Sequence, residues 1–337
     1  MLGPRSALAP TFAFLIGACA AASPTPSGSS SSVEAEPPLA SEAQPPTGPS
    51  VALHLSFDDA PGPNLSDVTE ANERNARILA ILVEHGVEAS VFFNCDKLRP
   101  GDTTIEAWEA AGMRVGNHTH SHMRLAEVGV DAWLADVDTC DAILDERLDQ
   151  ELRWFRYPYL CEGKDAAERD AALAGLAERG YANAHVTVAT SDWLLAGAYL
   201  GAKRAGDAEA QDEIADAYLE HMLESVEVAR EMARAQTGGE TAQVVLFHVN
   251  DLAADHLDAL LDAYEARGYR FVGLDAALAD PVFEATNHYA GPAGLSWLAR
   301  IHDPSTERQP YWFGLEEGRL DERFGHWLRP QQPKDQP

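Results

Sequence analysis

The chain is short of basic residues: it has 25 Lys and Arg against 54 Asp and Glu in 337 residues, a formal net charge of −29. Nucleic-acid binding needs a basic surface that replaces the counterions of the phosphates, so this charge argues against a nucleic-acid partner. It also argues against direct docking on an anionic membrane surface. We therefore expect neither partner, and nothing in the sequence identifies a protein partner.

Cysteine is scarce as well. The chain has four, which are too few for a disulfide scaffold. No apolar run reaches the roughly 18 residues that a membrane-spanning helix needs. The phosphate-binding patterns G-x-G-x-x-G and G-x-x-x-x-G-K-[ST] are missing after the first predicted strand, which argues against a nucleotide-binding sheet. Apolar residues still make up 45% of the chain, enough for a sizeable core.

The N-terminal segment predicts export. Residues 1–18 contain one charge, Arg5, and a short apolar stretch, as in a secretory signal. Cys19 follows Ile-Gly-Ala, which resembles a bacterial lipobox and predicts a lipid on Cys19; an ordinary signal in which Cys19 has no role is the alternative. Residues 19–50 are rich in Pro and Ser and predict a disordered linker. We expect a cell-envelope lipoprotein that meets the membrane only through this anchor, or otherwise a secreted protein.

From residue 51 onward, short apolar segments alternate with segments that have helical periodicity and end in Gly. Alternating βα units predict an α/β fold with a parallel sheet, and short strands that are apolar on both faces favour a closed barrel over an open doubly wound sheet. The expected strands are 51–57, 89–93, 113–117, 152–156, 181–188, 243–247 and 269–272. The expected helices are 69–85, 103–111, 131–148, 165–179, 207–236 and 255–267.

Polar residues with catalytic potential fall at the C-terminal ends of these strands, the face that carries the active site in βα barrels. In chain order they are Asp58 and Asp59, His118 and His122, Arg156, Asp192 and Trp193, and His248.

The segment His118-Thr119-His120-Ser121-His122 predicts a metal site. Histidines at i and i+4 on a helical turn face the same way and can hold one ion, and Asp58 or Asp59 can supply a carboxylate. His120 should point elsewhere. At Arg156 we expect a bidentate pair with a carboxylate.

Five segments together resemble the polysaccharide deacetylase family, also called carbohydrate esterase family 4 or the NodB-homology domain. Their order along residues 56–248 is the family's order. They are Ser56-Phe57-Asp58-Asp59-Ala60, His118-Thr119-His120-Ser121-His122, Arg156-Tyr157-Pro158-Tyr159, Ser191-Asp192-Trp193 and Leu246-Phe247-His248. The resemblance implies a distorted barrel of seven βα units, with a catalytic domain at 51–280.

The resemblance also implies roles for single residues. Zn²⁺, or another divalent ion such as Co²⁺ or Ni²⁺, is expected on Asp59, His118 and His122. The expected catalytic groups are Asp58 as general base, Arg156 orienting Asp58, His248 as general acid and Asp192 orienting His248. The backbone N–H of Tyr159 is expected at the oxyanion, and Trp193 and Leu246 are expected as walls of the acetyl pocket.

The implied reaction is hydrolysis of an N-acetyl group on an N-acetylglucosamine-containing polysaccharide, such as peptidoglycan or a chitin-like chain. An O-acetyl esterase acting on xylan, a non-catalytic sugar-binding module and a non-haem iron oxygenase are the alternatives. The oxygenase is an alternative because two His and one carboxylate also suit Fe(II).

Departures from the family pattern bear on the substrate more than on the catalytic groups. Ala60 replaces a Gly, so we expect that turn to avoid strongly positive φ; Ala189 replaces an Asp, and Leu160 stands where a Gly is common. A helical insertion is expected at 194–240 and a C-terminal extension at 281–337, whose tryptophans either cover the barrel or form a sugar-stacking lip. Two of Cys95, Cys140 and Cys161 could pair, and the spacing does not say which.

Overall fold

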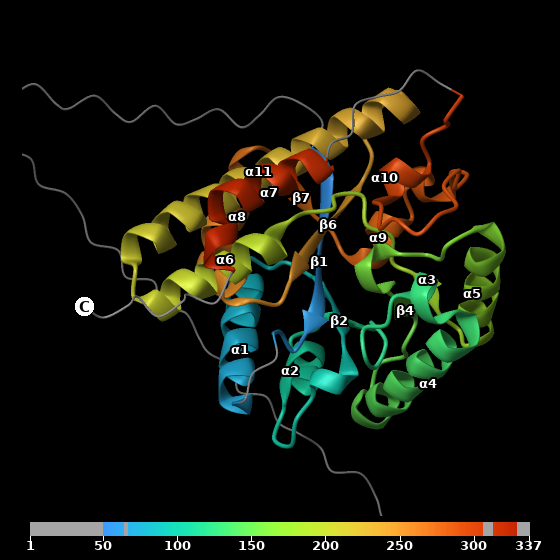
Figure 1. Ribbon diagram of the computed structural model, residues 1–337, viewed down its shortest axis with the longest axis horizontal. Helices are drawn as coiled ribbons and strands as arrows, with labels where there is room; N and C mark the ends of the chain where they lie inside the picture. Colours follow the sequence, from blue (N-terminus) through green and yellow to red (C-terminus); the bar gives the residue numbers. More distant parts are fainter. Residues whose placement is uncertain (1–49, 64–66, 306–312, 329–337) are drawn as a thin grey trace, which may run out of the picture. The chain divides into compact units, whose positions relative to one another are not determined.

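The structure is a computed structural model that describes residues 50–63, 67–305 and 313–328 (Figure 1). The predicted signal, Cys19 and all but the last residue of the predicted linker lie outside the described residues. Within them, no helix is long and apolar enough to cross a membrane.

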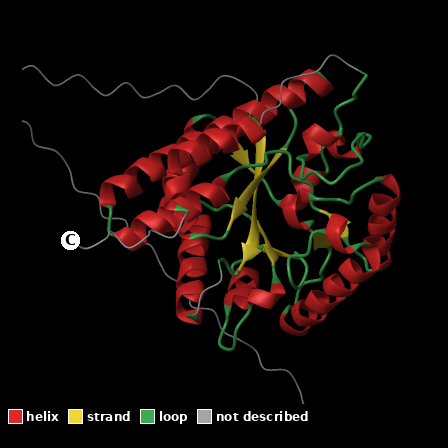
Figure 2. Cartoon of the chain, viewed as in Figure 1, coloured by secondary structure: helices red, strands yellow, loops and turns green. Residues whose placement is uncertain are grey.

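Seven parallel strands form the centre of the fold, with helices around them (Figures 1 and 2). The hydrogen-bonded order is β5-β4-β3-β2-β1-β6, and β7 pairs with the start of β1. A single bridge between Val188 and Val245 joins the segment after β5 to β6, which closes the ring. The strands are β1 (Ala52–Ala60), β2 (Ser90–Phe93), β3 (Arg114–Asn117), β4 (Trp154–Phe155), β5 (Ala182–Asn183), β6 (Gln243–His248) and β7 (Arg270–Phe271).

This arrangement confirms the predicted α/β fold and the distorted barrel of seven βα units. The distortion lies where the ladders are shortest, since β4, β5 and β7 keep only two residues each. The longest ladder joins β1 to β6 over Leu53–Gln243 to Asp58–His248. The strands that carry Asp58 and His248 are therefore the most firmly paired part of the barrel.

All six helices that the sequence pattern predicts are present. Several begin at an Asp or Asn whose side chain accepts a backbone N–H of the first turn, as at Asp67, Asp165, Asp207 and Asn250. The helices are α1 (Val68–Glu84), α2 (Thr104–Ala110), α3 (Leu125–Val128), α4 (Val130–Arg147), α5 (Ala166–Glu178), α6 (Asp192–Ala205), α7 (Ala208–Thr237), α8 (Asp251–Ala266), α9 (Leu274–Leu278), α10 (Trp297–Arg300) and α11 (Phe313–Phe324). Of these, α6 is the longest that was not predicted as a separate helix.

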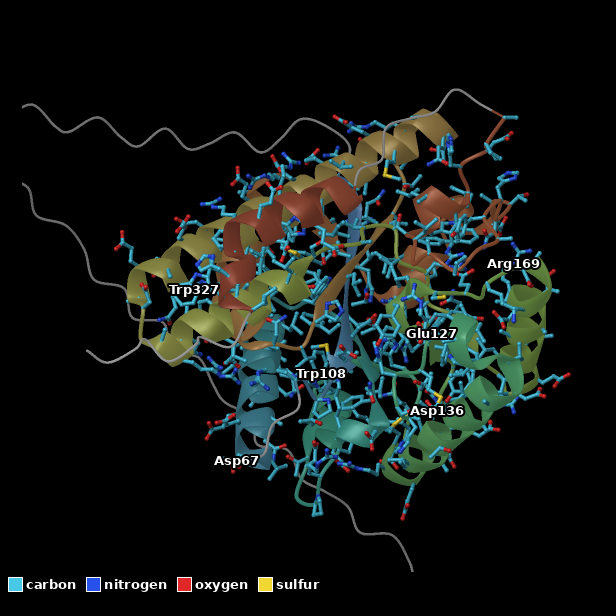
Figure 3. The ribbon with its side chains drawn as sticks, in the orientation of Figure 1. Asp67, Trp108, Glu127, Asp136, Arg169 and Trp327 are labelled. Atoms are coloured by element: carbon cyan, nitrogen blue, oxygen red, sulfur yellow. A yellow bond between two sulfur atoms is a disulfide. The ribbon has the colours of Figure 1, made fainter. Side chains whose placement is uncertain are left out.

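The core fills the barrel and the space between its strands and helices (Figure 3). Leu53, Leu55 and Phe57 of β1 are fully buried, and Phe57 stacks on Phe247 of β6 with ring centroids 5.0 Å apart. Trp108 of α2 closes the cluster from outside, where its indole N–H donates to Asn75 of α1. Consecutive strand residues are buried because both faces of the strand are covered.

The insertion and the tail pack mainly on helices, although α6 and α7 also contact β6. α6 and α7 pack together, and α11 lies along α6. Gly201 allows this approach, because a Cβ there would collide with the backbone of Trp327. Trp297 is buried in the core, so the described part of the tail has the predicted covering role.

The disulfide that the sequence left open joins Cys95 to Cys140, and Cys161 is free and buried. The disulfide links the turn after β2 to α4, close to the loop that follows β3. Both flanking segments therefore lie beside the candidate site.

Candidate metal and active site

The sequence pattern placed Asp58 and Asp59 after the first strand, but both lie inside β1. The strand is longer than predicted because its pairing with β6 continues to Asp58. Neighbouring residues of a regular strand point to opposite faces. Here Asp59 has φ 65°, and the register with β2 shifts between Phe57 and Ala60. This irregularity brings both carboxylates within 4 Å of the His118 imidazole, at 3.8 and 3.9 Å.

The histidine loop after β3 is not the predicted helical turn. Thr119 and His122 have φ 67° and 57°, and no helix begins before Leu125. Side chains supply the missing backbone pairing: Asn117 accepts the Thr119 N–H, and the Thr119 hydroxyl accepts the His122 N–H. The turn still places the His118 and His122 rings 4.9 Å apart, so the predicted proximity holds for a different reason.

One ligand atom each from Asp59, His118 and His122 lies within 4.8 Å of the others. His118 donates its Nδ1–H to the Arg156 carbonyl at 2.8 Å, which leaves Nε2 free to face Asp59. Such a hydrogen bond fixes the tautomer of a metal-ligating His. Asp59 Oδ1 is buried and lies 3.2 Å from Lys97 Nζ and 3.3 Å from His122 Nε2, but it accepts no hydrogen bond of good geometry among the described residues. These residues fit a divalent transition metal.

The pKa values of the three groups agree with this fit. Burial lowers the pKa of His118 and of His122, so both imidazoles are neutral near pH 7. Burial also acts to raise the pKa of Asp59, but favourable charge interactions, led by that of the Lys97 ammonium, outweigh it and hold that pKa below its ordinary value. Two neutral imidazoles and a carboxylate are the protonation states that bind metal.

Asp58 lies beside this cluster and is held by Arg156. The Arg156 guanidinium donates to Asp58 at 2.9 Å, to the Ser56 hydroxyl at 3.0 Å and to the Ala184 carbonyl at 2.7 Å. The predicted bidentate pair is therefore wrong, because two of the three contacts go to other oxygens. Burial raises the pKa of Asp58 to about 6, although the charges of Arg156 and His248 act in the opposite direction.

His248 is the register partner of Asp58 on the neighbouring strand, so the two residues face one centre. Its Nδ1 donates to Asp192 at 2.7 Å, and its backbone N–H donates to the other Asp192 oxygen at 2.8 Å. Asp192 and Trp193 are the first residues of α6 rather than part of a loop after a strand. Burial acts to lower the pKa of His248, but the Asp192 carboxylate dominates and raises that pKa to about 9.

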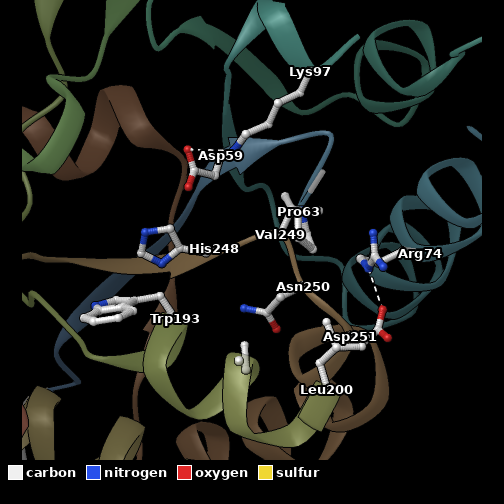
Figure 4. A pocket seen from close by; sticks show the side chains of 12 residues that line it. Asp59, Pro63, Arg74, Lys97, Trp193, Leu200, His248, Val249, Asn250 and Asp251 are labelled. Carbon is white, nitrogen blue, oxygen red and sulfur yellow. Dashed lines mark hydrogen bonds and ion pairs between the residues drawn. The ribbon is translucent and has the colours of Figure 1, made fainter. Parts of the chain in front are cut away.

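A pocket of about 170 Å³ opens beside these groups (Figure 4). Asp59, Trp193 and His248 lie at one end, and Arg74 with Asp251 lies at the other. The wall between them includes Ala196, Gly197 and Leu200 of α6, so the insertion shapes the pocket. Leu246 is not among the residues that line it; this side chain is 6% exposed within β6. Tyr159 is not among the lining residues either; its half-exposed ring packs on His122 with ring centroids 4.4 Å apart.

Backbone strain in the described residues gathers at this site. Non-glycine residues with positive φ are Asp59, Thr119, His122, Tyr159 and Leu160. Left-handed conformations cost free energy in residues other than Gly and persist where the surrounding structure enforces them, often at functional sites. The expectation that the turn around Ala60 avoids strongly positive φ is wrong, because Asp59 and Gly62 have φ 65° and 118°, although Ala60 itself does not have a positive φ.

The sequence did not identify Lys97 or Asp136. Lys97, at the end of the turn Cys95–Lys97, places its ammonium 3.2 Å from Asp59, in the wall of the pocket. Asp136 of α4 accepts hydrogen bonds from the backbone and hydroxyl of Ser121 and so supports the histidine loop (Figure 3). Neither residue belongs to a recognisable motif, so only the folded chain brings them to the site.

Comparison with protein families supports the resemblance carried by the motifs. Residues 45–178 match the family model described as polysaccharide deacetylase. This segment contains Asp58, Asp59, the histidine loop and Arg156. It ends before Asp192 and His248, whose place at the site comes from the structure.

Solved structures of family 4 carbohydrate esterases are similar to this chain at low identity. A pseudoenzyme from Bacillus anthracis has 20% identity and a TM-score of 0.49 over 68% of this chain and 66% of its own. The Bc1960 peptidoglycan N-acetylglucosamine deacetylase has 21% identity and a TM-score of 0.47 over 68% and 88%. Bacillus subtilis PdaA has 18% identity and a TM-score of 0.47 over 68% and 81%. With TM-scores below 0.5, these structures do not assign a function to this chain.

Proposed function

We propose that this chain is a metal-dependent hydrolase of the polysaccharide deacetylase family, which removes N-acetyl groups from a glycan that contains N-acetylglucosamine. The observation that carries the proposal is the meeting of three elements at one centre. These are the cluster of Asp59, His118 and His122, the base Asp58, and the pair of His248 with Asp192. A sugar-binding module without activity would need none of the acid and base groups.

Asp59, His118 and His122 would hold the metal. A divalent ion in such a site acts as a Lewis acid and lowers the pKa of a bound water to about 7. The chain's own contribution begins with Asp58, whose carboxylate accepts the proton of the attacking water. With a pKa of about 6, Asp58 is ionised at neutral pH yet basic enough to take a proton.

His248 then protonates the leaving amine, because an unprotonated amine is a poor leaving group. Its Nδ1 is occupied by Asp192, so Nε2 is the nitrogen that donates. The Tyr159 backbone N–H stabilises the negative charge that develops on the carbonyl oxygen; loss of one such donor typically costs about 10²–10³ in rate. The products are acetate and a free amino sugar.

The substrate class is tested by comparing chitin-type oligomers of N-acetylglucosamine with acetylated xylan. We expect higher turnover on the N-acetylated oligomers. Faster acetate release from xylan would replace the deacetylase by an O-acetyl esterase that uses the same residues. Oxidation of a substrate with Fe(II) and no release of acetate would instead favour the oxygenase alternative.

Replacing Asp192 with Asn should shift the alkaline limit of activity downward. The Asp192 charge raises the pKa of His248, so the imidazole stays protonated, and able to donate, up to about pH 9. Without that charge its pKa falls to about 6.5 or below, because burial acts to lower it, and the limit moves down by about 2.5 pH units or more. The measurement is kcat against pH for both proteins. An unchanged alkaline limb would mean that His248 is not the acid.

We also propose that the protein is exported and tethered through a lipid on Cys19, a proposal that rests on the sequence alone. The variant Cys19→Ser should leave the membrane fraction and keep its specific activity, since the linker separates anchor and domain. Cell fractionation with an activity assay tests this. Wild-type protein found only in the culture medium would contradict the anchor.

A further inference from the structure

The C-terminal extension contacts the loop that carries Tyr159. We call residues 287–300 the strap and residues 157–162 the oxyanion loop. In Figure 1 the strap is the orange segment that leads into α10 and lies near α3 and α5. Arg124, next to α3, donates to the Pro292 carbonyl at 2.8 Å, and Arg169 of α5 donates to the Tyr289 carbonyl at 3.1 Å.

The oxyanion loop has an unfavourable backbone. Tyr159 and Leu160 are consecutive residues with φ 58° and 50°. For L-residues this left-handed region brings Cβ close to the carbonyl oxygen, whereas Gly enters it freely. Leu160 is also the position at which the family resemblance leads one to expect Gly. Two hydrogen bonds within the loop close this turn, from the Leu160 N–H to the Tyr157 carbonyl at 3.0 Å and from the Cys161 N–H to the Pro158 carbonyl at 3.1 Å, and a restraint from outside the loop adds to them.

Arg300 supplies that restraint from the strap. Its guanidinium is 2% exposed and donates to the Leu160 carbonyl at 2.7 Å and to the Leu295 carbonyl at 3.2 Å. It also pairs with the buried Glu162 at 3.2 Å. A single buried cation thus fixes the carbonyl of the strained residue and the end of the loop.

Gly294 completes the contact on the Tyr159 side. A Cβ at Gly294 would collide with the Tyr159 carbonyl oxygen, so the strap backbone lies directly against the peptide that follows Tyr159. The Pro292 carbonyl accepts a hydrogen bond from Cys161 Sγ at 3.3 Å. The strap therefore meets three consecutive residues of the loop, Tyr159, Leu160 and Cys161.

We infer that the strap is part of the catalytic apparatus, with Arg300 and Gly294 as positioning residues that hold the Tyr159 N–H toward the reacting carbonyl. The inference rests on the proposed function for the role of that N–H. A Gly after Tyr159 would adopt the left-handed conformation without help. In this chain, where Leu160 occupies that position, we infer that the C-terminal extension stabilises the conformation instead.

A double-mutant cycle of Arg300→Met and Leu160→Gly tests the coupling. With Leu160 present, Arg300→Met should lower kcat roughly 10- to 100-fold with KM nearly unchanged, less than the full loss of an oxyanion donor at about 10²–10³. In the Leu160→Gly background the same change should lower kcat less than about 5-fold, because Gly adopts positive φ without restraint. Equal losses in both backgrounds would overturn the inference. The exposed Arg323→Met is the matched control.

Gly294→Ala provides an independent test that leaves Arg300 and Glu162 in place. We expect faster amide exchange at residues 157–162 and a lower kcat, measured well below the melting temperature of the variant so that the protein stays folded. The control Gly239→Ala, whose new Cβ would meet nothing within 4 Å, should change neither. Exchange that does not differ between Gly294→Ala and wild type would contradict the strap's role. If the wild type releases no acetate from any glycan, the proposed function fails while amide exchange still tests the strap.

Discussion

Asp58→Asn is expected to keep the metal and to lose about 10²–10⁴ of kcat, the usual contribution of a general base. Asn has nearly the same shape and still offers an oxygen to Arg156, which stays bound to Ser56 and to the Ala184 carbonyl. The three ligand side chains are untouched. What disappears is the ability to accept a proton at the position facing His118.

Kinetics measured together with metal content check this result. We expect the variant to contain as much metal as the wild type while its turnover is strongly reduced. If metal and activity fall in the same proportion, Asp58 is a ligand and the roles of the two carboxylates have to be exchanged. Full activity in the variant would remove Asp58 from the mechanism altogether.

His118→Ala and His122→Ala are each expected to abolish stoichiometric metal binding and activity together. Each variant removes one of only three protein ligands. Removing a residue that merely hydrogen-bonds to a ligand typically costs 10–100-fold in metal affinity or activity, and we expect the loss here to be roughly another order of magnitude larger. Metal content per chain and acetate release are measured on the same preparations.

His120→Ala is the matched control for these variants. His120 lies between the two ligands in sequence but belongs to no ligand cluster among the described residues; its imidazole faces Asp96 at 3.8 Å. The variant should bind metal as the wild type does. Loss of metal in His120→Ala, or its retention in both ligand variants, would contradict the assigned cluster.

The barrel could be predicted from the sequence because its strands are short apolar segments and its helices end in Gly or begin at Asp or Asn. The segment 181–188 shows the limit of such a pattern. Only Ala182–Asn183 is a strand, and the rest meets β6 through a single bridge. α6 was not predicted as a separate helix, because its apolar face packs on α7, α8 and α11, and that burial exists only after folding.

The candidate site was predictable as a set of residues but not as a geometry. Asp59, His118 and His122 come together through positive φ values at Asp59, Thr119 and His122, none of which is Gly. Backbone strain of this kind leaves no sequence pattern, because the surrounding fold enforces it. The roles of Lys97 and Arg300 could not be predicted for a related reason, since each reaches the site from a segment without a motif.

The most direct test of the account is acetate release by metal-free protein as one equivalent of Zn²⁺ is added, with N-acetylglucosamine oligomers as substrate. We expect no acetate without metal, a rise that saturates near one ion per chain, and one free amine for each acetate released. Equal activity before and after addition of metal, or no acetate from any N-acetylated glycan at saturation, would contradict it.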